Sequence, residues 1–343
     1  MSKRHVLHTA AALAVLVHGQ AAGTTPQDCV AIDDDSARLA CFDRAHGRGR
    51  VAVPATPTIT PVPPTAAVDA PAVRTVAGGL LTRAWALDGE VPTFQLLPYR
   101  SIYVLPLSAT DNINRRPFSP APGHSTGVDL PNQSVEAKFQ ISAKTLAWRS
   151  SLGDLWIAYT QSSRWQLYQE DISRPFRETN YEPELIFNIA TDFEAFGWRG
   201  RMAGVSLNHQ SNGRALPLSR SWNRVIGHLG LERDAWSVMF RPWLRINESA
   251  DSDDNPDIED YAGRAALTVR HETSAGHRLS LQLRHSLRSG ERSHGAGELE
   301  WAFPLKGQLH GFTQLFSGYG ESLIDYNIRQ SRIGVGFSLA GWD

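Results

Sequence analysis

The sequence has few cysteines, no excess of charge of either sign and, after its first residues, no long apolar run. Only 2 of the 343 residues are cysteine, and neither lies beyond residue 41, so thiol catalysis is excluded from the rest of the chain. The 34 lysines and arginines nearly balance the 35 acidic residues, so no global charge indicates a nucleic-acid partner. No run beyond residue 23 approaches the ~20 apolar residues of a membrane-spanning helix. A helical membrane protein is therefore excluded, whereas a β-barrel, whose strands alternate apolar and polar residues, is not.

The first 23 residues have the order of features found in an export signal. Lys3 and Arg4 provide a positive start, residues 10–17 are apolar, and residues 21–23 are small, as cleavage requires. A buried N-terminal helix is the alternative, but it does not explain this order. We therefore expect residues 1–23 to be a cleaved signal peptide.

Residues 24–50 contain both cysteines, and the segment that follows is rich in proline, alanine and threonine. In an oxidising compartment, Cys29 and Cys41 are expected to form a disulfide. A metal site is the alternative, although two cysteines alone do not complete one. The composition of residues 51–80 is typical of an extended linker. A small cysteine module is thus predicted ahead of a separate domain at residues 81–343.

From about Trp85 onward, short segments alternate between apolar and polar residues, which indicates half-buried strands. Leu279, Leu281 and Leu283, for example, alternate with arginine, serine and glutamine. Such segments lie near residues 99–107, 134–146, 154–168, 182–192, 198–209, 221–232, 235–247, 262–272, 277–288, 295–304, 308–316 and 331–340. Their even number, with the export signal, predicts an all-β fold, a twelve-stranded antiparallel transmembrane β-barrel. A soluble sandwich or barrel shares the same alternation and remains the alternative.

Aromatic residues near the ends of these segments fit the girdles that surround a barrel at the two membrane interfaces. We expect this position for Trp156, Tyr181, Trp222, Trp243 and Tyr261.

The most informative stretch contains a histidine, a serine and an asparagine at positions that a hairpin brings together. His209 and Ser211 are two residues apart, so on a strand they face the same side as the apolar Leu207. If two strands pair about residue 216, Asn223 stands opposite His209. This arrangement fits a nucleophile, a general base and a residue that orients the base. Residues that end a strand and form a turn are the alternative interpretation.

Several motifs in the same order resemble the outer membrane phospholipase A family. They are His-x-Ser-Asn-Gly-Arg at 209–214, Ser-Arg-Ser-Trp-Asn-Arg at 219–224, Phe-Arg-Glu-Thr-Asn-Tyr-Glu-Pro at 176–183, Asp-Asp-Asn-Pro-Asp at 253–257 and Ser-Gly-Tyr-Gly-Glu-Ser-Leu-Ile-Asp-Tyr-Asn at 317–327. The resemblance implies a twelve-stranded barrel in the outer membrane of a Gram-negative cell. It also implies calcium-dependent hydrolysis of phospholipid acyl esters at sn-1 and sn-2, lysophospholipids included, and activation by homodimerisation.

The resemblance also assigns roles to individual residues. The family's nucleophile matches Ser211, its histidine His209 and its asparagine Asn223. The family's oxyanion is held by a backbone amide that matches Gly213 and by a calcium-bound water. An interface glutamine of the dimer matches Gln161. The calcium supplies the positive charge at the oxyanion, and Asn223, being neutral, cannot itself stabilise an imidazolium by charge.

The same resemblance implies the ligands of calcium (Ca2+). In active dimers they match the carbonyl of Arg214, the hydroxyl of Ser219 and, from the partner subunit, Ser173. A second arrangement, without dimerisation, uses an aspartate that matches Asp254. The family pattern can place another aspartate at the position of Leu216, which cannot bind calcium.

Two other classes of function remain open on the sequence. One is a non-catalytic outer-membrane barrel, a channel or adhesin, on the same scaffold, and the other is a soluble periplasmic esterase. Glu321 and Asp325 are a carboxylate pair of the kind that glycosidases use, but we expect them to line a polar loop or lumen. The inward positions of Arg278, Arg284 and Arg332 predict ionic networks inside the barrel.

Overall fold

The computed structural model describes residues 26–46, 78–89 and 91–340. The predicted signal peptide and residues 51–77 of the predicted linker lie outside these ranges. The described residues belong to two units, which divide between Ala72 and Val73. None of the helices that they form is long and apolar enough to cross a membrane.

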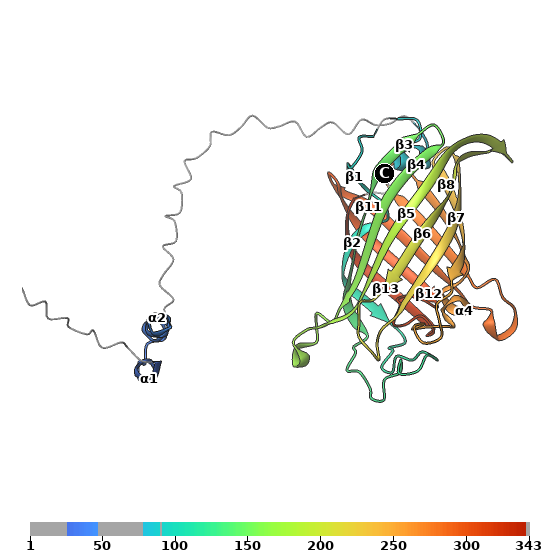
Figure 1. Ribbon diagram of the computed structural model, residues 1–343. Helices are drawn as coiled ribbons and strands as arrows, with labels where there is room; N and C mark the ends of the chain where they lie inside the picture. Colours follow the sequence, from blue (N-terminus) through green and yellow to red (C-terminus); the bar gives the residue numbers. More distant parts are fainter. Residues whose placement is uncertain (1–25, 47–77, 90, 341–343) are drawn as a thin grey trace, which may run out of the picture. The chain divides into compact units, whose positions relative to one another are not determined.

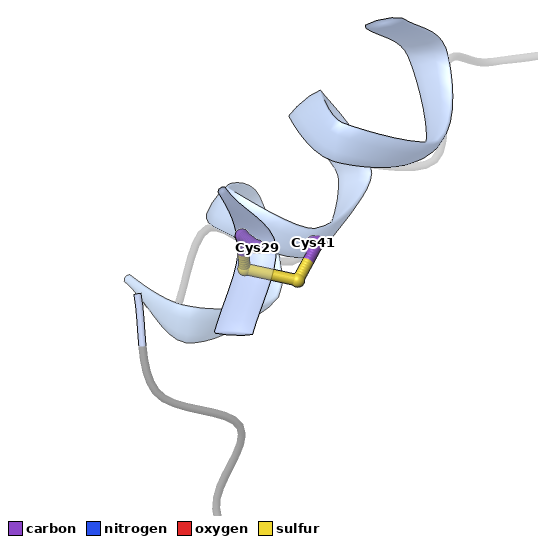
Figure 2. Close-up of a disulfide and its surroundings, with 2 residues drawn as sticks. All are labelled: Cys29 and Cys41. Atoms are coloured by element: carbon purple, nitrogen blue, oxygen red, sulfur yellow. A yellow bond between two sulfur atoms is a disulfide. The ribbon is translucent and has the colours of Figure 1, made fainter. Parts of the chain in front are cut away.

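The first unit contains two short helices held together by a disulfide. Helix α1 (Pro26–Cys29) and helix α2 (Asp35–Ala45) are joined by a bond between Cys29 and Cys41, as Figure 2 shows. Both cysteines are buried, and their Cα atoms are 5.5 Å apart. The side chain of Asp34 begins α2 by accepting a hydrogen bond of 2.8 Å from a backbone N–H of the first turn. The disulfide therefore replaces much of the core that so small a unit cannot build.

The second unit is a closed antiparallel barrel with twelve strand positions (Figure 1). The strands are β2 (Ile102–Thr110), β3 (Val135–Ser150), β4 (Gly153–Trp165), β5 (Phe176–Ala195), β6 (Trp198–Ser211), β7 (Ser221–Arg233), β8 (Trp236–Ile246), β9 (Ala265–Glu272), β10 (Arg278–His285), β11 (Gly295–Lys306), β12 (Leu309–Gly318) and β13 (Gln330–Ala340). Each pairs with its neighbours in sequence, and β13 pairs with β2 to close the barrel. The short β1 (Leu96–Pro98) pairs with β3 beyond β2, so the two share one position. The predicted fold is confirmed.

The two ends of the barrel differ in the length of their connections. At one end the strands are joined by short turns, at residues 151–152, 196–197, 234–235, 273–277 and 307–308. At the other end lie longer loops, at residues 111–134, 166–175, 212–220, 247–264, 286–294 and 319–329. Figure 1 shows these loops together at the lower end of the barrel. In outer-membrane barrels the short turns face the periplasm and the longer loops face outward.

The polarity of the wall is the reverse of that of a soluble protein. Outward-facing apolar side chains are exposed, among them Leu185, Ile189, Val205, Leu207, Leu281, Leu283, Ile333 and Val335. Inward-facing polar side chains are buried, among them Glu136, Lys138, Ser142, Glu182, Glu184, Asn208 and Arg224. An exposed apolar surface around a polar lumen suits lipid outside and side-chain networks inside.

Helix α3 (Leu80–Trp85) lies inside the end of the barrel that has the short turns. The carboxylate of Glu232 accepts hydrogen bonds from the backbone N–H groups of Leu81 (3.1 Å) and Thr82 (3.2 Å). The ring of Trp85 packs against Trp156 on the inner wall, with centroids 5.6 Å apart. Leu80, the last residue of the predicted linker, is thus the first residue of a helix that belongs to the barrel.

A network of ion pairs fills the lumen near the long loops. The buried carboxylate of Glu321 accepts hydrogen bonds from Arg164 (2.7 Å) and Lys138 (2.9 Å). Asp325 forms an ion pair of 2.7 Å with Arg177. Both carboxylates are held by cations, as expected of residues that line the lumen, and they do not form a catalytic pair.

The three arginines for which we predict ionic networks do face the lumen. Arg332 pairs with Glu136 at 2.8 Å, and Arg278 pairs with Glu272 at 3.2 Å. Arg284 differs, because it donates to carbonyl oxygens of the loop after β12, including that of Gly320 at 2.7 Å.

The prediction of aromatic girdles is wrong for three tryptophans. Trp156, Trp222 and Trp243 are buried within the barrel, at 0%, 2% and 6% exposure. Each has inward parity on its strand, so its position near a strand end does not bring it to the membrane interface. Tyr181, in contrast, has outward parity and is exposed.

Candidate active site

The candidate catalytic residues lie on the outer wall, where β6 and β7 approach their connecting loop. In the register of these strands, His209 is opposite Asn223 and Ser211 is opposite Ser221. All four residues have the outward parity of Val205 and Leu207, whose side chains are exposed. The register is the one predicted from the sequence. The site is therefore at the edge of the apolar surface, at the barrel end that carries the longer loops.

The histidine and the asparagine are in direct contact. Nδ1 of His209 is 2.8 Å from Oδ1 of Asn223, a hydrogen bond in which the imidazole donates. In the part of the chain that the structure describes, no hydrogen bond joins His209 to Ser211, which is the next outward residue of β6. Such contacts are often long without substrate, so Nε2 of His209 can still serve Ser211.

Asn223 has a second partner, which the sequence analysis missed. Its amide Nδ2 donates a hydrogen bond of 2.9 Å to Oε1 of Glu248, in the loop after β8. In the register of β7 and β8, Asn223 is opposite Ile246. Glu248, two residues further, therefore has the same parity, and this register was the signal that could have identified it.

The loop between β6 and β7 turns sharply just after Ser211. Gly213 has φ of +61°, and a Cβ there would lie 3.1 Å from the ring of Tyr181. Glycine is thus favoured both by the left-handed backbone conformation and by the close approach of the tyrosine ring. The side chain of Asn212 closes the loop, because it accepts from the backbone N–H of Arg220 (3.0 Å) and donates to the carbonyl of Leu218 (2.8 Å).

Oxygen atoms gather beside this loop. Oδ2 of Asp254 accepts hydrogen bonds from the hydroxyls of Ser219 (2.7 Å) and Ser221 (3.1 Å). Its other oxygen, Oδ1, is 2.9 Å from Nε2 of His124. Arg214 and Leu216 are exposed on the same loop. Of the predicted calcium ligands, the structure brings Ser219 and Asp254 together. No cluster of three or more His, Cys, Asp or Glu side chains suited to a metal occurs in the described ranges.

The segment that carries Glu248 and Asp254 is fixed to the barrel by buried polar contacts. The side-chain oxygen of Asn255 accepts from the backbone N–H of Ser221 (3.0 Å), and Arg245 donates to the carbonyl of Asn255 (3.2 Å). The hydroxyl of Tyr326 donates to the carboxylate of Asp257. Burial raises the pKa of Asp257, although this hydrogen bond opposes the shift. The position of Asp254, next to Asn255, is therefore set by the fold.

The remaining predicted residues lie further along the wall. Gln161 on β4 is opposite Tyr181 on β5, and Tyr181 is opposite Ser211, so the three form one row across adjacent strands. Gln161 is half-buried and accepts a hydrogen bond of 3.0 Å from Tyr159. Ser173 is exposed in the loop after β4, and within one chain the structure does not bring it to Ser219.

The sequence and the fold both match known proteins. A family model described as Phospholipase A1 matches residues 81–339. The Phospholipase A1 of Klebsiella pneumoniae is 39% identical over 274 residues, which cover 79% of this chain and 90% of that protein. That of Escherichia coli K12 is 38% identical over 274 residues, 79% of this chain and 89% of that protein.

Two solved structures share the fold. The crystal structure of the Salmonella typhi outer membrane phospholipase dimer with bound calcium has a TM-score of 0.65 and 36% identity, and covers 76% of this chain and 98% of that chain. The outer membrane phospholipase A of Escherichia coli has a TM-score of 0.63 and 37% identity, and covers 72% of this chain and 99% of that chain. The predicted resemblance is thereby confirmed. The chain belongs to the phospholipase A1 family, and it is a phospholipase of the Gram-negative outer membrane.

Proposed function

We propose that the protein hydrolyses the acyl esters of membrane phospholipids with Ser211 as nucleophile, His209 as general base and Asn223 as the residue that orients the base. The observation that carries this proposal is the hydrogen bond between His209 and Asn223, next to Ser211 on a lipid-facing wall. Polar side chains facing lipid are costly, so their presence there favours a function. Substrate esters at both sn-1 and sn-2, and those of lysophospholipids, can approach from the membrane along the exposed apolar surface.

The reaction has two halves that use the same histidine. Oγ of Ser211 attacks the ester carbonyl carbon while Nε2 of His209 takes its proton. The bond between that carbon and the glycerol oxygen then breaks, and His209 returns the proton to the leaving alcohol. A water molecule attacks the acyl-serine, again losing its proton to His209. The fatty acid leaves, and the proton returns to Ser211.

The developing negative charge on the carbonyl oxygen requires donors in place before the reaction begins. The backbone amide of Gly213 follows the nucleophile by two residues, on a loop closed by Asn212. It is our candidate for the first donor. With glycine in a left-handed conformation at position 213, the loop passes close to Tyr181, where a Cβ would crowd the ring.

The residues beside this loop fit a calcium ion. The Ser219 hydroxyl and the Asp254 carboxylate are both oxygen donors, which calcium prefers, and they are in contact at 2.7 Å. We propose that in a dimer Ser219 holds calcium together with the carbonyl of Arg214 and Ser173 of the second copy, and that a second arrangement, without dimerisation, uses Asp254. Bound calcium would supply positive charge near the oxyanion through a coordinated water. Because Leu216 provides no carboxylate, Asp254 is the acidic group that this loop can use.

A second copy of the chain would complete the site from the side of β4. Neighbouring strands are ~4.8 Å apart, so Gln161 lies roughly 10 Å from Ser211 along one row of the wall. A dimer that uses Gln161 therefore covers the approach to the nucleophile. The relative from Salmonella typhi is a dimer with bound calcium, which supports both parts of this proposal.

Fatty-acid release from mixed phospholipid and detergent micelles tests the proposed function. We expect release in calcium, little release when a chelator is added, and recovery when calcium is restored. Ser211→Ala should release no fatty acid under either condition. If this variant keeps more than a few per cent of the parent rate, the assignment of the nucleophile is wrong.

A further inference from the structure

We propose that Glu248 is a positioning residue for the hydrolytic reaction, acting on His209 through Asn223. The inference rests on the proposed roles of Ser211, His209 and Asn223 and adds a fourth residue behind them. Oε1 of Glu248 accepts the 2.9 Å hydrogen bond from Nδ2 of Asn223, while Oδ1 of Asn223 is 2.8 Å from Nδ1 of His209. The asparagine amide is thus held at both of its ends, by two different elements of the barrel.

The backbone brings Glu248 to this place. Asn223 pairs with Ile246, the last residue of β8, and the same register continued would put Glu248 opposite Ser221. A residue in that position is diagonal to Asn223 and within reach of a long side chain. The loop in which it lies is anchored by buried Asn255, whose side chain accepts from the backbone N–H of Ser221. Glu248 itself is half-buried, and its carboxylate is held in place by the hydrogen bond from Asn223.

The chemistry of the two side chains determines which way the amide of Asn223 points. An ionised carboxylate only accepts hydrogen bonds, so the NH₂ group of the amide must face Glu248. The amide oxygen then faces His209, and Nδ1 of the imidazole must carry a hydrogen. Nε2 is consequently left with a free lone pair, the form that can take the proton of Ser211.

Without Glu248 the amide can rotate by half a turn. Its NH₂ group would then donate to Nδ1 of His209, and the imidazole hydrogen would move to Nε2. That tautomer cannot accept the proton of Ser211, so every molecule in this state is inactive. Glu248 therefore increases the fraction of molecules in which the base has its lone pair toward the nucleophile.

The charge of Glu248 acts in the same direction. When His209 takes a proton it becomes a cation, and neutral Asn223 cannot balance that charge. The carboxylate of Glu248 lies directly behind the asparagine amide, at the edge of the lipid phase, where electrostatic interactions are stronger than in water. It can therefore stabilise the imidazolium through the amide that lies between them.

Kinetics of Glu248 variants in calcium-containing mixed micelles test the proposal. We expect Glu248→Ala to lower kcat about tenfold and to change KM less than about twofold, since orientation affects the reaction rather than substrate binding. Glu248→Gln keeps an acceptor but loses the charge and can also present its NH₂ group, so its kcat should lie between those of the parent and Glu248→Ala. Glu248→Asp keeps an acceptor-only group and should recover part of the loss.

The decisive measurement is a double-mutant cycle with Asn223→Ala. If Glu248 acts through Asn223, Glu248→Ala should change kcat by less than about twofold once Asn223 is alanine. Multiplicative losses, or a parent-like kcat for Glu248→Ala with intact Asn223, would overturn the proposal. Asp251→Ala is the matched control, because it removes a charge from an exposed residue of the same loop. An equal loss in this control would show a general effect of loop charge and would also overturn it.

Failure of the proposed function gives a different result. A fluorophosphonate probe, which labels an activated serine, should label the parent rapidly, Glu248→Ala about tenfold more slowly and Ser211→Ala not at all. Labelling and hydrolysis that persist in Ser211→Ala would reject the serine mechanism itself. If labelling and hydrolysis are lost in Ser211→Ala but keep the parental rates in Glu248→Ala, only the role of Glu248 is rejected. The heat-dependent gel mobility of each variant shows that the barrel has folded.

Discussion

The inner and outer walls of the barrel both carry polar side chains, but the two sets are partnered in different ways. On the inner wall, Glu321 is buried, and its carboxylate is paired with two cations, Arg164 and Lys138. On the outer wall, His209 is exposed among apolar residues and is bound on one side only, to Asn223. In the described residues its Nε2 has no hydrogen-bond partner.

This difference separates structural from functional polar groups. Paired charges of the lumen, such as those of Glu321, Arg164 and Lys138, replace lost hydration with one another and connect strands to a loop. The outer cluster, His209, Ser211 and Asn223, has an unused acceptor at Nε2 of His209 on a lipid-facing wall, where polar groups are costly unless they act on a ligand. The hydrogen-bond and ion-pair partners of the polar groups, rather than polarity itself, therefore distinguish the inner wall from the outer wall. Substitutions on the inner wall should affect stability, and substitutions on the outer wall should affect activity.

The largest effect is expected for the outer cluster, and only on activity. Ser211→Ala and His209→Ala should each lower kcat by at least about 10³-fold, because nucleophile and base act as one unit. The temperature at which the folded gel band disappears should stay at the parental value, since both side chains contribute little packing. A variant that loses activity together with this transition would show that the outer cluster is structural too.

The matching change on the inner wall should affect stability instead. Glu321→Ala leaves Arg164 and Lys138 buried without their carboxylate, which costs about 3–5 kcal/mol for a broken buried pair. Urea unfolding in detergent measures the loss, and molecules that remain folded should keep the parental kcat. Asp192→Ala is the control, because it breaks an exposed ion pair with Arg199 at a short turn. If the urea midpoint of Glu321→Ala equals that of Asp192→Ala, the inner-wall charges do not stabilise the barrel more than exposed ones, and the comparison of the two walls is wrong.

The outer wall was predictable from the sequence because its chemistry follows a period of two. Alternation fixed the inward or outward direction of each residue, and one hairpin register placed His209 opposite Asn223, as the structure has it. The same rule would have placed Trp156 and Trp222 inside the barrel, where they are buried. Their position along the strand alone predicts the membrane interface, and parity is the feature that places them inside.

The inner wall could be predicted only in outline. Its contacts join residues far apart in the chain, such as Lys138 with Glu321 and Thr82 with Glu232, and no local pattern encodes such pairs. Glu248 lies just beyond the end of β8, so the strand pattern alone does not include it, and only the register of β7 and β8, continued by two residues, brings it to Asn223. Helix α3 has a short sequence whose burial depends on the barrel around it, so the sequence predicts its first residue as part of the linker.

The proposed calcium site and dimer sharpen the comparison, because Gln161 lies on the outer wall and Ser173 in an exposed loop, and neither is part of the lumen. If Ser173 of the second copy completes the calcium site, calcium and the partner must each increase the affinity for the other. Sedimentation in detergent across a calcium titration should show the dimer rising with calcium, and activity rising with the dimer. Gln161→Ala should shift both curves several-fold to higher calcium. Leu281→Ala, an outward residue of β10, is the control and should shift neither.

Full activity in a purely monomeric population would reject the composite site. The triad would not be affected by that result, since His209, Ser211 and Asn223 all lie on β6 and β7 of one chain.

The smallest effect is expected at the N-terminus, where the cysteine module and helix α3 can be separated. Deleting residues 24–72 removes the cysteine module together with both cysteines of its disulfide. It leaves the second unit complete from Val73. Calcium-dependent activity in detergent should stay within about twofold of the parent, because every proposed catalytic residue lies in the barrel.

A longer deletion, of residues 24–85, also removes α3, so Glu232 loses its hydrogen bonds from Leu81 and Thr82, and the ring of Trp85 leaves a cavity beside Trp156. That protein should unfold at lower urea while the shorter deletion does not. If the shorter deletion folds with an unchanged midpoint but is inactive, the module belongs to the active site, and the barrel alone does not account for the activity.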